Sequence, residues 1–384
     1  MKPDMRNYFY VFLGLHSFLI GLFPFYIPVY LYANGFSLDE ICLFIAITGL
    51  GFCLCLYVWD RITQQVAFHF LVAGSYFSEI VLLSLFFLEK DVFFLLSAAF
   101  CNGIFNCTFW IIQRLLFLET INPLNSGKKF GNFQIFVLVV LKSAIFIGGL
   151  LLESSGFLSI YLVSAGVVLL SFVIFLKVIK KIEFKNEWRT APFLSVTRVL
   201  SFRDRFRSRW IFAFDGIFLY LESYFWIISL FLIVRESFSR LGILVISLTV
   251  CFGVIFIFIK NKIDQISVNT FYKSAVVLYM FSWLLRVMVS KMHHLTTLLV
   301  LMAVITFCTS IFRLAFNKRF FDNAQSSTAH EYIYLKSYYS QGFLLLFLLF
   351  PLLFTLFKGS DVEQLSFIYA GAAVFSTIYL IYRK

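Results

Sequence analysis

Charged residues are scarce in this chain. They make up 14% of its 384 residues, whereas 61% are hydrophobic; an ordinary soluble domain is about a quarter charged. A soluble core could not enclose so much apolar surface, because a folded domain has a large surface for its volume. The composition therefore excludes a soluble globular protein and places most of the chain in lipid.

The sequence also lacks the motifs of catalysis and metal binding. Its seven cysteines all fall in apolar stretches, without CxxC or Cys/His ligand spacing, so we interpret them as small core residues. HExxH and GxSxG motifs are absent, as is a pair of aspartates at membrane depth. We therefore expect a protein that is not an enzyme and that binds neither a metal nor a cofactor.

Long apolar runs dominate what the chain does contain. Most are long enough to cross a hydrocarbon core about 30 Å thick as a helix. The sequence therefore predicts an all-α integral membrane protein with twelve transmembrane helices. The spans are expected at about 8–33, 38–59, 66–88, 92–118, 130–152, 157–179, 208–234, 240–259, 269–290, 295–316, 336–357 and 363–382.

The basic residues predict the orientation of these spans. When the amino terminus is placed in the cytoplasm, most of the 32 lysines and arginines fall in cytoplasmic segments. Arg319, between spans ten and eleven, and Lys336, at the start of span eleven, are counted among them. Because basic loops stay on the cytoplasmic side, we expect both termini there, in a bacterial inner membrane. Anionic lipid then explains the net charge of +12 without a nucleic-acid partner.

The spans divide into two related halves. The longest polar stretch runs from Lys177 to Arg209 and separates six spans from six. "IIQRLLF" in span four matches "SIFRLAF" in span ten, with Arg114 and Arg313 at corresponding places. Such repetition is typical of a duplicated transporter. The predicted units are an N-terminal six-helix bundle over 1–179, a basic cytoplasmic linker over 180–207 and a C-terminal six-helix bundle over 208–384.

This architecture resembles the major facilitator superfamily. Between spans two and three, "LYVWDRITQQ" contains Asp60 and Arg61, the core of the family's Gly-x-x-x-Asp-Arg-x-Gly-Arg-Arg signature, without its trailing glycine and basic pair. The second half has a weaker counterpart, "IKNKIDQIS", which contains Asp264. The resemblance implies two pseudo-symmetric bundles that rock around a cavity lined by helices one, four, seven and ten. It also implies a cytoplasmic gate in which Asp60 and Arg61 act with Glu119.

Three of these four cavity spans carry polar residues at helical spacing. Residues three or four apart share one helix face. Charged side chains at membrane depth usually face protein or water, so these faces are the candidate substrate and proton pathway. They consist of Asn102, Asn106, Trp110 and Arg114 in span four, Asp215, Leu219, Glu222, Trp226 and Ser229 in span seven, and Thr306, Ser310, Arg313 and Asn317 in span ten.

Each charged candidate has a structural alternative. Arg114 and Arg313 could instead extend to the membrane surface, as long basic side chains do. Glu222 lies near mid-span on a presumed cavity helix, where a carboxylate can load and release a proton; alternatively it forms a fixed pair with Lys142 or an arginine. Asp215 lies nearer the cytoplasm and could cap its helix or pair with the linker.

Two further residues complete the candidate pathway. Lys142 lies near mid-span in span five, which flanks the cavity in the family, and His16 in span one titrates near neutral pH. Either could equally be structural. We expect Glu79 and Arg286 to be structural partners.

The favoured interpretation is a monomeric secondary active transporter surrounded by membrane lipids. It moves a small organic solute, anionic or amphipathic, by alternating access. Protons are the expected coupling ion, and export is favoured because no uptake motif is visible. The alternatives are a lipid or lipid-linked-precursor flippase, a polytopic membrane enzyme, and a protein of transporter fold that moves nothing.

Overall fold

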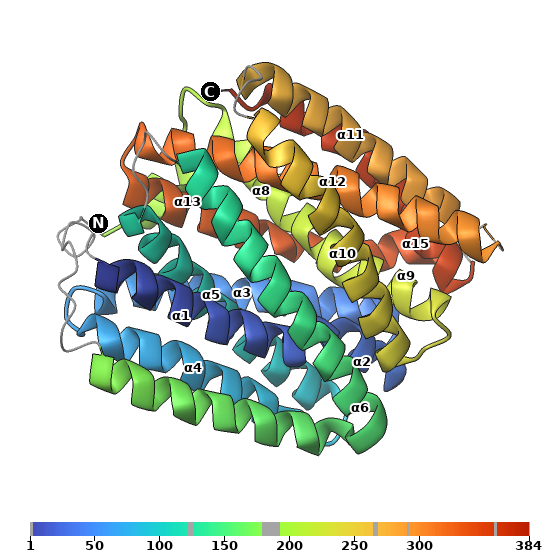
Figure 1. The fold of residues 1–384 in the computed structure, drawn as a ribbon, viewed down its shortest axis with the longest axis horizontal. Helices are drawn as coiled ribbons and strands as arrows, with labels where there is room; N and C mark the ends of the chain where they lie inside the picture. The colour runs from blue at the N-terminus through green and yellow to red at the C-terminus, as the bar shows by residue number, and fades with distance from the viewer. Residues whose placement is uncertain are drawn as a thin grey trace.

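The computed structural model describes residues 3–120, 126–178, 193–263, 268–289, 292, 294–356 and 359–383. Every regular element in these ranges is a helix. The long helices lie side by side in one bundle, and both chain termini lie toward the same end of it (Figure 1). The predicted all-α fold is therefore confirmed for the described chain.

The first span is interrupted near its far end. It consists of α1 (Pro3–Leu22), the short η1 (Pro24–Tyr26) and α2 (Ile27–Ala33). Pro24 and Pro28 lie at this interruption. They account for it, because proline lacks the N–H that an unbroken helix needs. The helices that follow are α3 (Leu38–Ile62), α4 (Phe68–Leu85), α5 (Val92–Thr120) and α6 (Ser126–Val178).

The long α6 contains two spans. Its helical dihedrals break at Gly156, which has φ 72° and ψ −176°. A residue with a side chain rarely adopts this conformation, whereas glycine does so freely. Figure 1 shows the chain doubling back here, so that the two arms of α6 run in opposite directions. These arms correspond to the fifth and sixth predicted spans.

The second half of the chain repeats the pattern of long helices. After the short α7 (Val196–Leu200), the seventh span is built from three consecutive helices. These are α8 (Ser208–Tyr220), the π-helical turn η5 (Leu221–Phe225) and α9 (Trp226–Ile233). The later elements are α10 (Phe238–Ile263), α11 (Val268–Val289), α12 (Leu295–Gln325), α13 (Ala329–Gly342), η6 (Phe343–Leu349), α14 (Phe350–Leu356), α15 (Asp361–Phe375) and η7 (Ser376–Ile381).

The lengths and composition of these helices suit a membrane. In the described part of the chain, 10 helices are long and apolar enough to cross one. One of them, 135–175, contains both arms of α6, and Phe238–Val250 is a further, shorter apolar helix. Together these account for the twelve predicted spans.

Two predicted boundaries are wrong. Span ten was expected to end at 316, but α12 continues to Gln325; span eleven was expected to begin at 336, but α13 begins at Ala329. Arg319 and Lys336 therefore lie in helices and are buried. Hydropathy ends span ten too early and begins span eleven too late because the extra turns carry polar side chains, among them the buried Arg319 and Asn323.

The two halves of the chain meet along pairs of helices. The helix α3 packs against α13 and η6, and α6 packs against α10. Gly49 on α3 allows the first approach, because a Cβ there would overlap the backbone carbonyl of Gln341. The domain boundaries at 179/180 and 207/208 stay a prediction, and residues 179–192 lie outside the described ranges.

Candidate functional site

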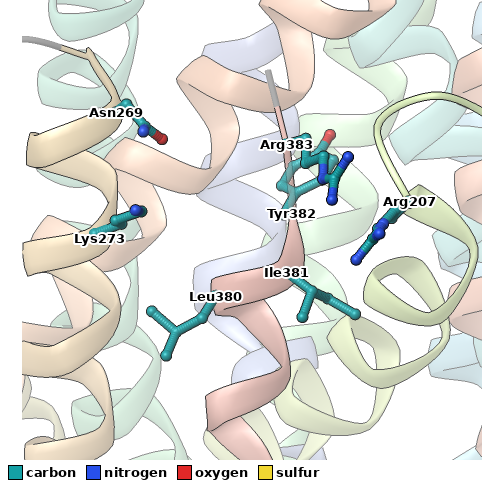
Figure 2. A pocket seen from close by; sticks show the side chains of 7 residues that line it. All are labelled: Arg207, Asn269, Lys273, Leu380, Ile381, Tyr382 and Arg383. Carbon is teal, nitrogen blue, oxygen red and sulfur yellow. The ribbon is translucent and has the colours of Figure 1, made fainter.

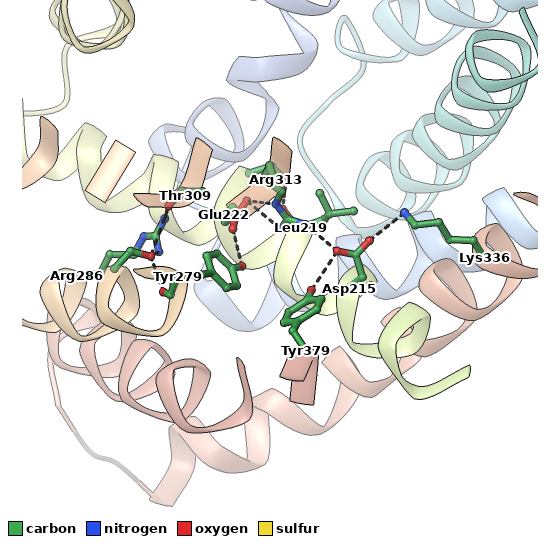
Figure 3. A network of polar contacts seen from close by, with 11 residues as sticks. Asp215, Leu219, Glu222, Tyr279, Arg286, Thr309, Arg313, Lys336 and Tyr379 are labelled. Carbon is green, nitrogen blue, oxygen red and sulfur yellow. Dashed lines mark hydrogen bonds and ion pairs between the residues drawn. The ribbon is translucent and has the colours of Figure 1, made fainter. Parts of the chain in front are cut away.

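Arg313 on α12 joins two carboxylates from the seventh span. Its Nη1 donates to Asp215 Oδ1 at 2.7 Å, and its Nε donates to Glu222 Oε2 at 3.0 Å. Figure 3 shows the guanidinium lying between the two acids. The forked donor geometry of arginine suits such bridging, which a lysine could not reproduce.

Asp215 has a second cation and a hydroxyl as partners. Lys336 Nζ on α13 lies 2.9 Å from Asp215 Oδ2, and the two side chains are only 5% and 1% exposed. The hydroxyl of Tyr379 donates to Asp215 Oδ1 at 3.0 Å. Since both oxygens are engaged, this carboxylate is held in one position. Its partners are α12, α13 and η7, and not the basic linker that the sequence left open.

Glu222 is held less tightly and remains partly accessible. The hydroxyl of Tyr279 on α11 donates to its Oε1 at 2.5 Å. The Glu222 side chain is 14% exposed. Tyr279 is itself fixed by a ring that stacks on Phe312, with centroids 3.9 Å apart. The Glu222 side chain is more exposed than that of Asp215, which is 1% exposed.

The backbone around Glu222 departs from a regular α-helix. Glu222 lies in the π-helical turn Leu221–Phe225, between α8 and α9. A π turn inserts an extra residue and so changes which side chains share a helix face; such turns are common at functional sites. Here the turn places Glu222 toward α11 and α12, the helices that supply Tyr279 and Arg313.

Arg114, the counterpart of Arg313 in the first half, has a different kind of partner. Its Nη1 donates to the hydroxyl of Ser337 on α13 at 2.7 Å, and its guanidinium lies 6.0 Å from the Trp110 ring. The side chain therefore points across to the second half of the chain, next to the residue that follows Lys336. The two matched arginines do not share one structural role, because only Arg313 binds carboxylates among the described contacts.

Asn102 and Asn106, on the same polar face of span four as Arg114, connect it to the seventh span. The Asn102 amide donates to the hydroxyls of Thr48 and Tyr224, at 3.2 Å each. The Asn106 amide donates to Asn102 O at 2.8 Å and Oδ1 at 3.1 Å. Because Tyr224 belongs to the same π turn as Glu222, the asparagines connect α5 to the turn.

Arg286 lies beside this cluster. Its Nη1 donates to the Ser282 hydroxyl at 3.1 Å and its Nη2 to the Thr309 hydroxyl at 2.9 Å. The guanidinium lies over the rings of Trp283 and Trp226, at 4.1 and 5.1 Å. Trp226, on the polar face of span seven, is thus a cation–π partner of Arg286. Ser310 is half-buried on α12, between Thr309 and the Arg313 turn.

Two other candidates lie apart from the cluster. His16 Nε2 is 2.9 Å from the Ser75 hydroxyl, and its ring stacks on Tyr76 at 3.9 Å. Its Nδ1 lies 4.0 Å from Glu79, and both side chains are fully buried. Lys142 Nζ lies 5.7 Å from the centre of the Phe25 ring. The Glu222 pair with Lys142 is therefore not formed, and an arginine takes that place.

Of the described gate residues, Asp60 is hydrogen-bonded to the predicted linker, whereas Arg61 is hydrogen-bonded to a residue of its own helix. Asp60 Oδ2 accepts the backbone N–H of Leu194 at 2.9 Å. Arg61 Nη1 donates to Tyr57 O at 2.8 Å, and its guanidinium lies 3.5 Å from the Tyr57 ring. The Glu119 side chain and all of Asp264 lie outside the described residues. The gate itself stays a prediction.

Three residues of the cluster escaped the sequence analysis. Lys336 was counted with the cytoplasmic basic residues at the start of span eleven, and Tyr279 and Tyr379 were not singled out. The polar composition of Ala329–Gly342, rich in tyrosine and serine, is the signal that could have extended span eleven. Among the described residues, no group of three or more His, Cys, Asp or Glu side chains could hold a metal ion.

Comparisons with known proteins agree with this arrangement. A sequence model described as Major Facilitator Superfamily matches residues 9–334, whereas curated protein sequences give no match. Among solved structures, the nucleoside transporter NupG has a TM-score of 0.68 at 12% identity, over 99% of this chain and 98% of that one. The transporter FucP, in the outward conformation, has a TM-score of 0.62 at 11% identity, over 96% and 98%.

Identities this low show a shared fold alone, but the family match covers most of the chain. It favours a transporter over the polytopic enzyme that the sequence left open. The twelve spans, the bundle of the described helices and the family match lead to one assignment. The chain belongs to the major facilitator superfamily of secondary transporters.

Proposed function

We propose that this chain moves a small organic anion by alternating access and couples the movement to protons. The observation that carries the proposal is the position of Arg313, shared between the buried Asp215 and the accessible Glu222. Such a shared arginine can change partners when one carboxylate is neutralised.

The balance of charge around the cluster favours an anionic substrate. Four cations lie in or beside the cluster, against the two carboxylates of Asp215 and Glu222. The cations are Arg114, Arg286, Arg313 and Lys336. Buried charges without an opposite charge are costly at membrane depth, so a bound anion would lower the free energy of this region. The described hydrogen bonds of Arg114 and Arg286 go to hydroxyls, so neither guanidinium is hydrogen-bonded to a carboxylate among the described contacts.

The two carboxylates suit different roles. Asp215 is 1% exposed and is held by two cations and a tyrosine, so it keeps its charge as a fixed anchor. Glu222 is partly exposed, and its described partners are Arg313 and Tyr279. A proton that binds Glu222 removes one of the two carboxylates from Arg313. The guanidinium can then bind a carboxylate or phosphate of the substrate, which couples proton binding to substrate binding.

Aromatic side chains favour a substrate with an apolar part. Trp110 is 39% exposed and lies beside Arg114. Indole rings bind flat apolar groups and cations well. One of the similar structures is a nucleoside transporter, so a nucleoside is the second candidate substrate. A nucleoside has no net charge, however, so it would not compensate the excess positive charge around the cluster.

Direction and location stay predictions. We retain a bacterial inner membrane, cytoplasmic termini and a monomer as the working hypotheses. Export stays a prediction of the sequence: the coupling proposed above carries proton and anion in the same direction, so export by this route requires an outward proton gradient. A lipid flippase is the remaining alternative within the transporters.

The test uses the full chain purified into sealed liposomes with a pH-sensitive dye inside. Organic anions, zwitterions, cations and nucleosides are added one at a time, with protein-free liposomes as the control. The proposal predicts proton movement with at least one anion and none with cations. Movement with nucleosides alone would favour the second candidate. Solute transport without protons would contradict the coupling, and lipid movement alone would favour the flippase.

A further inference from the structure

A cavity lies at the end of the bundle that carries the C-terminus. Its volume is about 570 Å³. Figure 2 shows side chains from α11, from the start of α8 and from the last turn of the chain around it. The lining residues are Arg207, Asn269, Lys273, Leu380, Ile381, Tyr382 and Arg383.

The polar lining of this cavity consists of cations and hydrogen-bond donors. Arg207, Lys273 and Arg383 are exposed and positively charged. The Oδ1 of Asn269 accepts from Arg319 Nη2 at 3.1 Å, so the amide group of Asn269 remains free to donate. The described lining includes no carboxylate. Three cations without an acid form a site for an anion with several oxygens, such as a phosphate.

The wall that holds Arg383 is fixed by the backbone of the chain end. Arg319 Nη1 donates to Tyr382 O at 2.6 Å, and its guanidinium lies 3.8 Å from the Tyr272 ring. The Arg383 N–H donates to Phe206 O at 3.1 Å, and its carbonyl accepts from Asn323 at 3.0 Å. These hydrogen bonds fix the shape of the wall, and a fixed site loses less entropy when it binds a ligand.

The backbone conformation of Arg207 is a second observation that favours a binding site here. It has φ 60°, in the left-handed region that residues with a side chain rarely adopt. Such backbone strain tends to be kept where it positions a functional group. Here it places Arg207 at the start of α8, on the side of the cavity opposite Lys273 (Figure 2).

The remaining wall is apolar. Leu380 and Ile381 are 42% and 40% exposed and form the last turn of η7. In Figure 2 both lie below Arg207 and Arg383, with Leu380 toward the Lys273 side and Ile381 toward the Arg207 side. Cations at the end of a membrane helix can contact the phosphate of a phospholipid at the membrane surface, and the neighbouring apolar side chains can contact its acyl chain.

We propose that this cavity binds the phosphate headgroup of an anionic phospholipid, with an acyl chain along Leu380 and Ile381. The three cations and the Asn269 amide hold the phosphate. Because the cavity joins α8, α11 and η7, a bound lipid ties three helix ends of the second half together. This site does not depend on the transported substrate.

The test measures lipid retention on the full chain by native mass spectrometry from detergent micelles. The probes are phosphatidylglycerol and phosphatidylcholine with the same acyl chains. We expect the wild-type chain to retain phosphatidylglycerol in preference. Each of Lys273→Ala and Arg383→Ala should weaken that retention roughly fivefold, the effect of losing one basic contact near the membrane surface. Arg383 is anchored through backbone atoms, so the alanine variant keeps the wall intact.

Arg203→Ala is the matched control, because Arg203 is an exposed arginine of the same region outside the cavity. It should retain the lipid as the wild type does. Equal retention in all variants would overturn the proposal. A double variant, Leu380→Ser with Ile381→Ser, should also lose the lipid. Displacement of the lipid by soluble glycerol 3-phosphate would overturn the lipid assignment in favour of a soluble phosphate compound, whereas retention in its presence supports the lipid.

Discussion

Asp215 and Lys336 form a buried ion pair, with 2.9 Å between Oδ2 and Nζ. Removing two charges from water is costly, and the cost is offset only when further hydrogen bonds complete the arrangement. Asp215 meets this condition, because Arg313 and Tyr379 bind its other oxygen. The pair therefore forms the fixed part of the cluster, beside the more accessible Glu222.

Replacement of Lys336 by methionine should destabilise the protein. The change keeps most of the side-chain volume but leaves Asp215 with one cation. Breaking one side of a buried pair typically costs about 3 to 5 kcal/mol. Thermal unfolding in detergent measures the loss. Adding Asp215→Asn to the same chain should recover part of it, and Arg203→Met, on an exposed arginine, should have little effect. An unchanged melting temperature for Lys336→Met would show that the pair is not important for stability.

Arg114→Ala should impair transport more than expression. The variant removes a charge that faces the second half of the chain, together with its hydrogen bond to Ser337. Ser337→Ala is the matched variant, because it removes the hydrogen bond and keeps the charge. If the charge attracts the substrate, Arg114→Ala raises the KM for an anion about tenfold or more, and Ser337→Ala changes it less. Equal effects of the two variants would favour a purely structural role.

Gly49→Ala should lower both stability and transport. A Cβ at Gly49 would overlap the Gln341 carbonyl, where α3 meets α13 and η6. Overpacking of this kind costs about 1 to 3 kcal/mol. Gly74→Ala is the control: Gly74 lies inside α4 with open space around its Cβ position, so alanine should be neutral or slightly stabilising. Thermal unfolding and solute exchange test both variants. Identical behaviour would contradict the close approach of the two helices.

The sequence predicted the helices and several members of the cluster for clear physical reasons. Apolar runs of membrane length locate the spans, and helical spacing places Asp215 and Glu222 on one face. Arg313 was found because a charge within a span is unusual enough to notice. The partners of these residues were left open, since hydropathy and spacing contain no information on how helices pack.

Each missed feature has its own physical cause. Span eleven was expected to begin only at Lys336 because the preceding turns of α13 carry polar residues, which lower hydropathy; Tyr332 and Tyr334 in these turns are nevertheless buried. Tyr279 and Tyr379 look the same in sequence as aromatics that face lipid. The π turn at Glu222 has no pattern of its own, because it depends on the local backbone rather than on residue type.

The most direct test of the proposed coupling is Glu222→Gln, measured in two ways on the same proteoliposomes. Glutamine keeps the shape and can still accept a hydrogen bond from Tyr279, but it cannot gain and lose a proton. We predict that substrate exchange without a pH gradient continues, whereas accumulation driven by a pH gradient is lost. Glu89→Gln, at an exposed glutamate between α4 and α5, should retain both. Normal gradient-driven accumulation in Glu222→Gln would contradict the role of Glu222 as the proton carrier.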